Sequence, residues 1–233
     1  MPTVTYLERR EQLETYFDRT AVDAWSRMTS NAPLGRIRTT VREGREQMRN
    51  TLLSWLPQDL SGARVLDAGC GTGALATEAA RRGADVIAVD LSPTLVKLAK
   101  QRTDQTFKTG SIDFQVGDML SPKHGHFDYI VAMDSLIHYS AADMARSLGL
   151  LAPRSEHGVL CTFVPRTPLL ALMHTTGRLF LRKDRAPAVE PTSPAKLHQL
   201  ISAEPRLAAW RLGRTKRISN GFYTSEALEL THK

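Results

Sequence analysis

The chain has 233 residues, of which 42% are hydrophobic and 24% are charged. This length and balance are typical of one soluble globular domain with additions. Only two cysteines, Cys70 and Cys161, are present, which argues against a disulfide framework and indicates a reducing, cytoplasmic environment. The polar amino terminus and the lack of an apolar run of about 20 residues lead us to expect neither a signal peptide nor a membrane-spanning helix.

The net charge of +7 is unevenly distributed. Residues 1–60 carry nine basic and eight acidic side chains and residues 61–150 carry nine and ten, whereas residues 151–233 carry thirteen and six. A basic carboxyl-terminal third predicts an anionic partner (a carboxylate-bearing substrate, a membrane surface or nucleic acid), although a solvated basic face is the simpler alternative. Nucleic acid is disfavoured, because the sequence has no interleaved aromatic platform and no nucleic-acid-binding motif.

Two helices are predicted before the first core strand. Apolar residues recur near helical spacing over residues 5–29 and again over residues 36–56, and Pro57 closes this region. We interpret residues 1–57 as an amino-terminal helical cap and residues 58–233 as the main domain. Additions of this kind to an α/β fold commonly cover the site or bind the substrate. The alternative is that they only pack on the sheet.

A glycine-rich turn follows the first predicted strand, near residues 64–68. Three glycines at every second position, Gly69, Gly71 and Gly73, separate this strand from a helix that begins at Ala74. They let the backbone turn tightly and approach a ligand closely. Asp67 precedes them, and a carboxylate there would repel a pyrophosphate and suit a ligand with an amine. A glycine-rich turn in any α/β protein is the simpler alternative for the glycines alone.

Two further strands also end in a carboxylate. The apolar stretch over residues 85–90 ends at Asp90, which is 23 residues after Asp67, the spacing of a carboxylate that binds the ribose hydroxyls of a nucleoside. A helix is expected to start at Ser92-Pro93. The stretch over residues 112–119 contains Asp118 near its end. Three strands that each end in an acid are a more specific signal than any one of them.

A polar loop over residues 121–126 precedes the fourth strand. His124 and His126 could contribute to a metal site there, but zinc sites need more ligands, so we interpret the segment as a solvated loop. The fourth strand is predicted over residues 127–134. His138 and Tyr139 follow it on the side where ligands of open α/β sheets bind, so we expect His138 to lie in the substrate site.

The remaining elements are a helix over residues 141–151, a fifth strand over 158–164, a helix from Ser193-Pro194 and two strands over 207–230. Between the fifth strand and that helix, residues 165–190 combine apolar runs with basic side chains. This suits a large flat ligand that carries carboxylates, a membrane-surface helix or an ordinary sheet-covering helix. The basic residues of the segment are Arg166, Arg178, Arg182, Lys183 and Arg185.

The glycine loop and the three acid-terminated strands resemble the S-adenosylmethionine-dependent methyltransferases of the Rossmann-like class. This resemblance implies an α/β fold with a mostly parallel seven-stranded sheet, preceded here by two helices and interrupted by an insertion after strand five. It also implies that Asp67 and the glycines hold the methionine part, Asp90 the ribose, and Asp118 with Met119 the adenine. The full set of implied cofactor contacts is Asp67, Gly69, Gly71, Gly73, Asp90, Leu91, Asp118, Met119 and Met133.

Several segments outside the loop are similar to one family, the magnesium protoporphyrin IX methyltransferases of chlorophyll and bacteriochlorophyll synthesis. They are Tyr16-Phe17 with Trp25, residues 136–139, Thr167-Pro168-Leu169-Leu170 with Arg185-Ala186-Pro187, and residues 217–223. One departure is Met28-Thr29-Ser30, where many relatives carry an aromatic hydroxyl. If that hydroxyl positions the substrate in relatives, Thr29 does so only weakly or another group substitutes.

The resemblance implies methyl transfer from S-adenosylmethionine to a propionate carboxylate of magnesium protoporphyrin IX. We expect His138 to orient that propionate without being an obligatory base. The magnesium belongs to the substrate, so no protein metal site is expected. Resemblance also implies contact with the porphyrin-binding subunit of magnesium chelatase, and contact with a membrane surface stays open. The expected substrate contacts are Tyr16, Tyr139, Arg166, Arg185 and Tyr223.

Two other functions remain open at this point. One is a methyltransferase for a different acid or for a hydroxyl-bearing small molecule. Whether residues 165–190 bind a porphyrin would distinguish this function from the methylation of magnesium protoporphyrin IX. The other is a non-catalytic cofactor-binding partner of a tetrapyrrole complex, which would bind the cofactor without turnover. A nicotinamide oxidoreductase is disfavoured by the glycine spacing and by Asp67.

Overall fold

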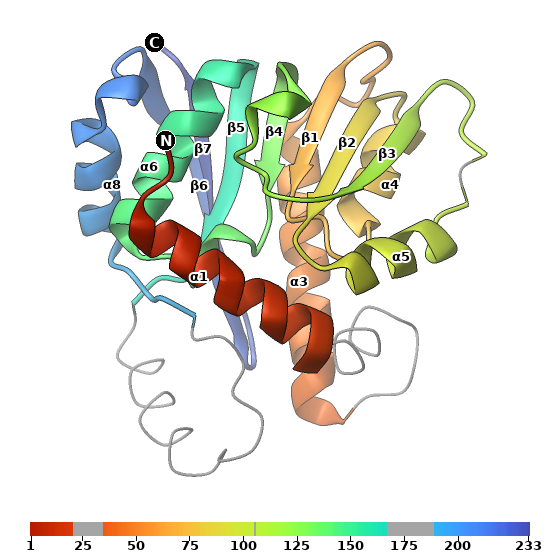
Figure 1. Ribbon diagram of the computed structural model, residues 1–233, viewed down its shortest axis with the longest axis horizontal. Helices are drawn as coiled ribbons and strands as arrows, with labels where there is room; N and C mark the ends of the chain where they lie inside the picture. The colour runs from red at the N-terminus through yellow and green to blue at the C-terminus, as the bar shows by residue number, and fades with distance from the viewer. Residues whose placement is uncertain (21–34, 105, 167–188) are drawn as a thin grey trace.

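A seven-stranded sheet forms the centre of the protein in a computed structural model that describes residues 1–20, 35–104, 106–166 and 189–233 (Figure 1). The strand order is β3-β2-β1-β4-β5-β7-β6. Strands β1 to β5 pair in parallel, while β7 runs antiparallel between β5 and β6. The mostly parallel α/β sheet expected from the sequence is therefore confirmed.

The strands lie close to the predicted positions. They are β1 (Arg64–Ala68), β2 (Asp85–Asp90), β3 (Ser111–Val116), β4 (Phe127–Ala132), β5 (Ser155–Phe163), β6 (Trp210–Asn220) and β7 (Tyr223–His232). The predictions for β3 and β4 were too long at their carboxyl ends, since β3 ends at Val116 and Asp118 lies after it. Strand β4 stops at Ala132 because Asp134 has a φ of 52°, which lies outside the extended region.

Long helices cover both faces of the sheet. Helices α3 (Arg36–Trp55), α4 (Ala74–Arg81) and α5 (Pro93–Arg102) contribute to the hydrophobic cluster on one face. Helices α1 (Val4–Thr15), α6 (Ala141–Leu151) and α8 (Pro194–Ala203) contribute to the cluster on the other. The short helices are η1 (Tyr16–Thr20), η2 (Pro122–His124), η3 (Leu136–His138), η4 (Ala152–Arg154) and η5 (Pro205–Leu207).

The predicted helix starts are confirmed in detail. The hydroxyl of Ser92 accepts a hydrogen bond from the backbone N–H of Leu95, and Pro93 occupies the first turn of α5. Ser193 caps α8 in the same way. These caps satisfy backbone donors that a helix cannot satisfy itself. The helix predicted over residues 5–29 corresponds to α1 followed by the π-helical η1, and residues 21–34 lie outside the described part.

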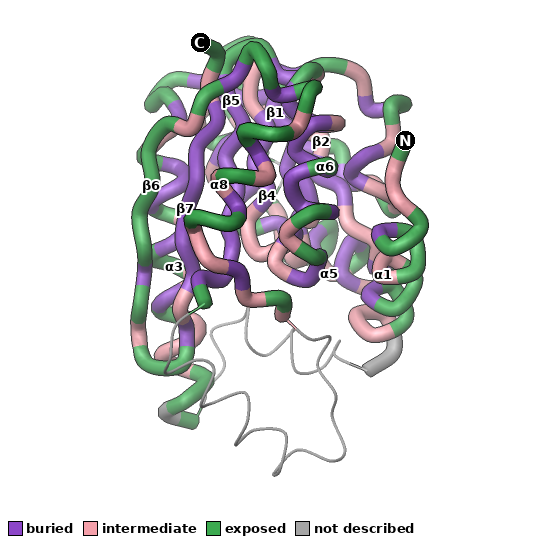
Figure 2. Tube along the Cα trace, turned by 90° about the vertical axis from the view of Figure 1, so that its left-hand side faces the viewer, coloured by how far each residue is buried: buried purple, intermediate pink, exposed green. Residues whose placement is uncertain are grey.

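Both amino-terminal helices pack on the sheet. Met48 and Leu52 of α3 are fully buried in the cluster that includes β1 and α4, and Tyr6 and Leu13 of α1 are buried in the cluster that includes α6 and α8. Figure 2 shows buried stretches alternating with exposed ones along both helices. Helix α1 crosses the sheet near the carboxyl ends of its strands (Figure 1). The boundary at residue 57 between a cap and a main domain stays a prediction.

The polar loop after β3 is not solvated at His124, contrary to our prediction. His124 is buried, and its Nε2 lies 3.1 Å from the backbone oxygen of Asp118. Burial lowers the pKa of His124, because the charged imidazolium loses its hydration. None of the helices within the described ranges has both the length and the apolar character that crossing a bilayer requires.

Candidate active site

A cavity of about 360 Å³ lies at the carboxyl ends of the central strands. The glycine loop after β1 and the segments that follow β2, β3 and β4 form one part of its wall. Helices α1 and α3 form another part, and residues of η1, η3, α4 and α5 complete it. This is the edge at which open parallel sheets bind their ligands. The volume also falls in the usual range of small-molecule sites, roughly 300–1,000 Å³.

The glycine loop approaches the cavity with its backbone. Gly69 and Gly71 have positive φ angles of 88° and 54° and line the cavity. A Cβ on Gly69 would lie 2.3 Å from the Cβ of Ser135, so only glycine fits there. Gly73, with a φ of 80°, precedes α4 and packs against Phe114 without lining the cavity. The structure therefore brings two of the three predicted glycines to the site.

Asp67 lies beneath the loop and does not line the cavity. Its side chain is buried, and Oδ2 accepts a hydrogen bond of 3.1 Å from the backbone N–H of Ala76 in α4. Burial raises the pKa of Asp67 to about 7. A direct contact with the methionine part of a cofactor stays a prediction for Asp67. Its observed contact instead supports the start of α4.

Cys70 lines the cavity as a buried thiol. Burial raises its pKa well above the usual value, and the nearby Asp90 and Asp67 carboxylates act in the same direction. A thiol that stays protonated is a poor nucleophile. Cys70 is therefore better described as a small residue that fills the tight turn of the glycine loop than as a nucleophile.

The carboxylate of Asp90 holds the glycine loop in place and also faces the cavity. Its Oδ2 accepts a hydrogen bond of 2.8 Å from the Gly71 N–H, and its Oδ1 accepts one of 3.0 Å from the Ser92 N–H. The carboxylate also lines the cavity together with Leu91. Because a carboxylate has about four acceptor positions, these two backbone bonds leave acceptor capacity for the hydroxyls of a ribose. Burial raises the pKa of Asp90, and the backbone N–H groups of Ser92, Gly71 and Leu91 oppose that change.

Asp118 is occupied by helix α1. Its Oδ1 accepts hydrogen bonds of 2.8 Å from the hydroxyl of Tyr6 and from the backbone N–H of Leu120, and its Oδ2 pairs with Arg10 at 3.0 Å. Asp118 does not line the cavity, whereas its neighbour Met119 does. The predicted contact between Asp118 and adenine stays a prediction. In this structure Asp118 anchors α1 over the strand ends.

The segment after β4 brings His138 and Tyr139 to the cavity. His138 is 9% exposed, and its ring meets Phe17 edge-on with the ring centroids 5.6 Å apart. Tyr139 stacks on Tyr6 at 4.6 Å. The backbone oxygen of His138 accepts a hydrogen bond of 2.8 Å from Nε of Arg9. Residues from α1 and η1 thus hold this segment against the cavity, which Met133 also lines.

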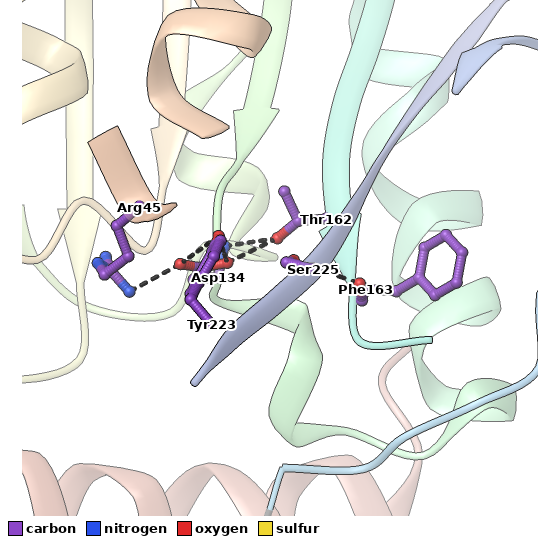
Figure 3. Close-up of polar contacts among 6 residues, drawn as sticks. All are labelled: Arg45, Asp134, Thr162, Phe163, Tyr223 and Ser225. Atoms are coloured by element: carbon purple, nitrogen blue, oxygen red, sulfur yellow. Dashed lines mark hydrogen bonds and ion pairs between the residues drawn. The ribbon is translucent and has the colours of Figure 1, made fainter. Parts of the chain in front are cut away.

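Sequence reasoning did not identify the arginines of α3 as part of the site. Arg42, Arg45 and Arg49 line the cavity from one side of the helix. The guanidinium of Arg45 pairs with Asp134 at 2.7 Å, and Asp134 was also missed as a site residue (Figure 3). The spacing of three and four residues places the arginines on one helical face. That pattern is visible in the sequence, but the position of the helix beside the glycine loop is not.

Most of the other predicted substrate contacts lie away from the cavity wall. Tyr16 packs edge-on against Phe17, and the hydroxyl of Tyr223 donates to Asp134 at 3.1 Å. The side chain of Arg166 is exposed. Arg185, like most of the 165–190 insertion, lies outside the described residues. Of this group only Tyr139 lines the cavity. A substrate role stays a prediction for all five residues.

Metal-ligating side chains do not cluster in the described part of the chain. Within it, no group of three or more His, Cys, Asp or Glu side chains is arranged to hold a metal ion. His124 and His126 lie on η2 and just after it, but the first is buried and the second is exposed.

Comparison with known proteins identifies relatives that match almost the full length of this chain. A family model for the carboxyl-terminal part of magnesium-protoporphyrin IX methyltransferases matches residues 132–232, and a general methyltransferase-domain model matches residues 65–153. The magnesium-protoporphyrin O-methyltransferase of Rhodobacter capsulatus is 47% identical over 225 residues, which cover 96% of this chain and 97% of that protein. The chloroplastic magnesium protoporphyrin IX methyltransferase of Arabidopsis thaliana is 28% identical over 94% of this chain and 70% of its own length.

A solved structure supports the same relationship. The crystal structure of magnesium protoporphyrin IX methyltransferase from Synechocystis PCC 6803 with bound SAH superposes with a TM-score of 0.83. The match covers 96% of this chain and 100% of that one, at 26% identity. The sequence identity and the structural similarity both extend over nearly the full length of the compared chains, so they point to the same family. The chain therefore belongs to the magnesium-protoporphyrin O-methyltransferase family.

Proposed function

We propose that this protein transfers the methyl group of S-adenosylmethionine to one propionate carboxylate of magnesium protoporphyrin IX. The product is the monomethyl ester, an intermediate of chlorophyll and bacteriochlorophyll synthesis. The observation that carries the proposal is the 47% identity to the Rhodobacter capsulatus magnesium-protoporphyrin O-methyltransferase across 97% of that relative.

The chemistry of the cavity wall fits the cofactor. The Asp90 carboxylate suits the ribose hydroxyls, and the apolar Leu91 and Met119 suit the adenine face. Gly69 and Gly71 line the cavity, so their backbone can approach the methionine part closely. Arg49 of α3 also lines the cavity and offers a cation to the carboxylate of that methionine part, since guanidinium groups bind carboxylates through paired hydrogen bonds.

Catalysis requires alignment more than proton transfer. A propionate carboxylate is ionised near pH 7 and is already a nucleophile. S-adenosylmethionine supplies a methyl group on a sulfonium, and S-adenosylhomocysteine (SAH) leaves once the carboxylate oxygen has accepted that methyl. His138 hydrogen-bonds the propionate and orients one of its oxygens towards the cavity. The surrounding rings of Phe17, Tyr6 and Tyr139 keep water from the carboxylate, which favours attack.

The acceptor carries its own magnesium, so this mechanism assigns no metal to the protein. Magnesium protoporphyrin is a large, flat and largely hydrophobic acceptor that carries carboxylates. Direct transfer from the porphyrin-binding subunit of magnesium chelatase therefore forms part of the proposal, as does contact of the basic carboxyl-terminal third with an anionic membrane surface.

The decisive experiment mixes the purified protein with methyl-labelled S-adenosylmethionine and magnesium protoporphyrin IX. Metal-free protoporphyrin IX serves as the comparison substrate. We expect a labelled monoester from the magnesium form. Tight cofactor binding without any labelled ester would refute the proposed reaction and direct attention to other carboxylate or hydroxyl acceptors.

His138→Ala tests the role of that side chain. We expect turnover to fall on the order of 10- to 100-fold, the usual effect of losing an orienting contact, with little change in SAH affinity. His157→Ala is the matched control, because His157 is 54% exposed near the amino-terminal end of β5. An equal loss of turnover and of SAH affinity would instead place His138 in the cofactor site or in the structural core.

A further inference from the structure

Asp134 has an unusual backbone conformation at the cavity. Among the described residues it is the only non-glycine with a positive φ, at 52°. Its side chain is 3% exposed and lines the cavity between Met133 and Ser135. Strained conformations of this kind persist only where the surrounding structure holds them, and they concentrate at functional sites.

Side chains from three elements hold Asp134 (Figure 3). The backbone N–H of Asp134 donates to Oγ1 of Thr162 in β5 at 2.8 Å, and the Thr162 hydroxyl donates to Oδ1 at 3.2 Å. Arg45 of α3 donates to Oδ2 at 2.7 Å. The hydroxyl of Tyr223 in β7 lies 3.1 Å and 3.2 Å from the two carboxylate oxygens. Charged and buried hydrogen bonds of this kind specify one geometry.

Tyr223 is itself held by α3. A Cβ on Gly44 would lie 2.5 Å from Cδ1 of Tyr223, so the ring packs directly on the helix backbone. The neighbouring Phe222 N–H donates to Oγ1 of Thr40 at 3.4 Å. The β6–β7 hairpin therefore docks on α3, and its first β7 residue reaches Asp134. Tyr223, which the sequence led us to expect as a substrate contact, acts on this carboxylate in the structure.

Two consequences follow for methyl transfer. First, the left-handed turn at Asp134 sets the direction of the chain that leads through Ser135 and η3 to His138. Second, the acceptor is an anion, and the buried carboxylates of Asp90 and Asp134 in the cavity wall would repel it. The Arg45 guanidinium, 2.7 Å from Asp134, offsets the charge of this carboxylate.

We propose that Asp134 is a positioning residue for methyl transfer. Arg45, Thr162 and Tyr223 hold its turn so that His138 meets the acceptor carboxylate. Asp134 acts through these neighbours and not as a base. This proposal rests on the function proposed above.

Asp134→Asn is the first test. Asparagine has the same size and tolerates the left-handed region, but it lacks the charge that pairs with Arg45. We expect kcat for magnesium protoporphyrin IX to fall about 10- to 100-fold, with SAH affinity and thermal unfolding close to those of the wild type. Asp128→Asn is the matched control, because Asp128 lies at the opposite end of β4.

Further variants separate positioning from a merely structural role. Asp134→Gly relieves the backbone strain and removes every side-chain contact, so we expect a folded protein with the same loss of kcat. Tyr223→Phe removes only one donor and should give a smaller loss. In a double-mutant cycle, adding Arg45→Gln to Asp134→Asn should cause little additional loss, because both changes break one ion pair.

Each result has a defined meaning. The positioning role is overturned if the wild type turns over and folded Asp134→Asn or Asp134→Gly has an unchanged kcat. The proposed function would then remain intact. Additive losses in the Arg45 cycle overturn the coupling through that ion pair. No turnover by the wild type overturns the proposed function and this proposal with it.

Discussion

The buried carboxyl of Asp67 should make the stability of this protein depend on pH in an unusual direction. Asp67 is 2% exposed, and burial raises its pKa to about 7, although the Ala76 N–H opposes that change. In the unfolded chain the pKa is close to 3.9. A raised folded-state pKa means that the native state binds the proton more tightly. The resulting stability is present below about pH 4 and is lost as the pH rises through about 7.

The size of this effect follows from the shift. Three pKa units correspond to about 4 kcal/mol over the whole titration, at 1.36 kcal/mol per unit. By the linkage relation, the free energy of unfolding should fall by on the order of 2–3 kcal/mol between pH 5 and pH 8 because of this group. The full value applies because the group is buried and little screened by solvent.

Asp67→Asn isolates this contribution. The amide oxygen of asparagine still accepts the Ala76 N–H, but the side chain no longer titrates. We expect the free energy of unfolding of the variant to fall less between pH 5 and pH 8 than that of the wild type, by on the order of 2–3 kcal/mol. Urea titrations of the cofactor-free proteins at several pH values measure this difference.

Asp85→Asn is the control for general effects of charge, because Asp85 lies exposed at the start of β2. Parallel pH profiles for wild type and Asp67→Asn would refute the reasoning. They would mean that Asp67 is ionised in the native protein and that its charge is compensated.

The other predictions concern the cofactor site and the packing of the hairpin. Asp90→Ala should weaken SAH binding by about 2–4 kcal/mol, the value of one or two charged hydrogen bonds. Calorimetry measures this loss, with Asp85→Ala as the control. An unchanged SAH affinity would contradict the assignment of Asp90 to the ribose. Gly44→Ala should lower the free energy of unfolding by about 1–3 kcal/mol, because its Cβ would lie 2.5 Å from Tyr223. Gly35→Ala, where a Cβ meets nothing within 4 Å, is the control for denaturant unfolding, and equal stability of both variants would contradict the packing argument.

The acid-terminated strands illustrate how far sequence patterns reach. Asp67 and Asp90 were both expected to end strands and to meet the cofactor. The structure places only Asp90 in the cavity wall, whereas Asp67 supports α4 and Asp118, after β3, anchors α1. The pattern of apolar residues identifies where a strand ends. It does not determine which backbone donors or neighbouring side chains will occupy the carboxylate there.

The sequence by itself determined the parallel sheet, the glycine loop and the place of His138 after β4, because these depend on local signals. Apolar periodicity specifies strands and helices, and glycines accept positive φ angles that other residues resist. Contacts between distant segments required the tertiary structure. Tyr6 and Asp118 are separated by 112 residues, and Arg45 and Asp134 by 89. Such pairs are set by how α1 and α3 pack on the two faces of the sheet, and no local propensity encodes that placement.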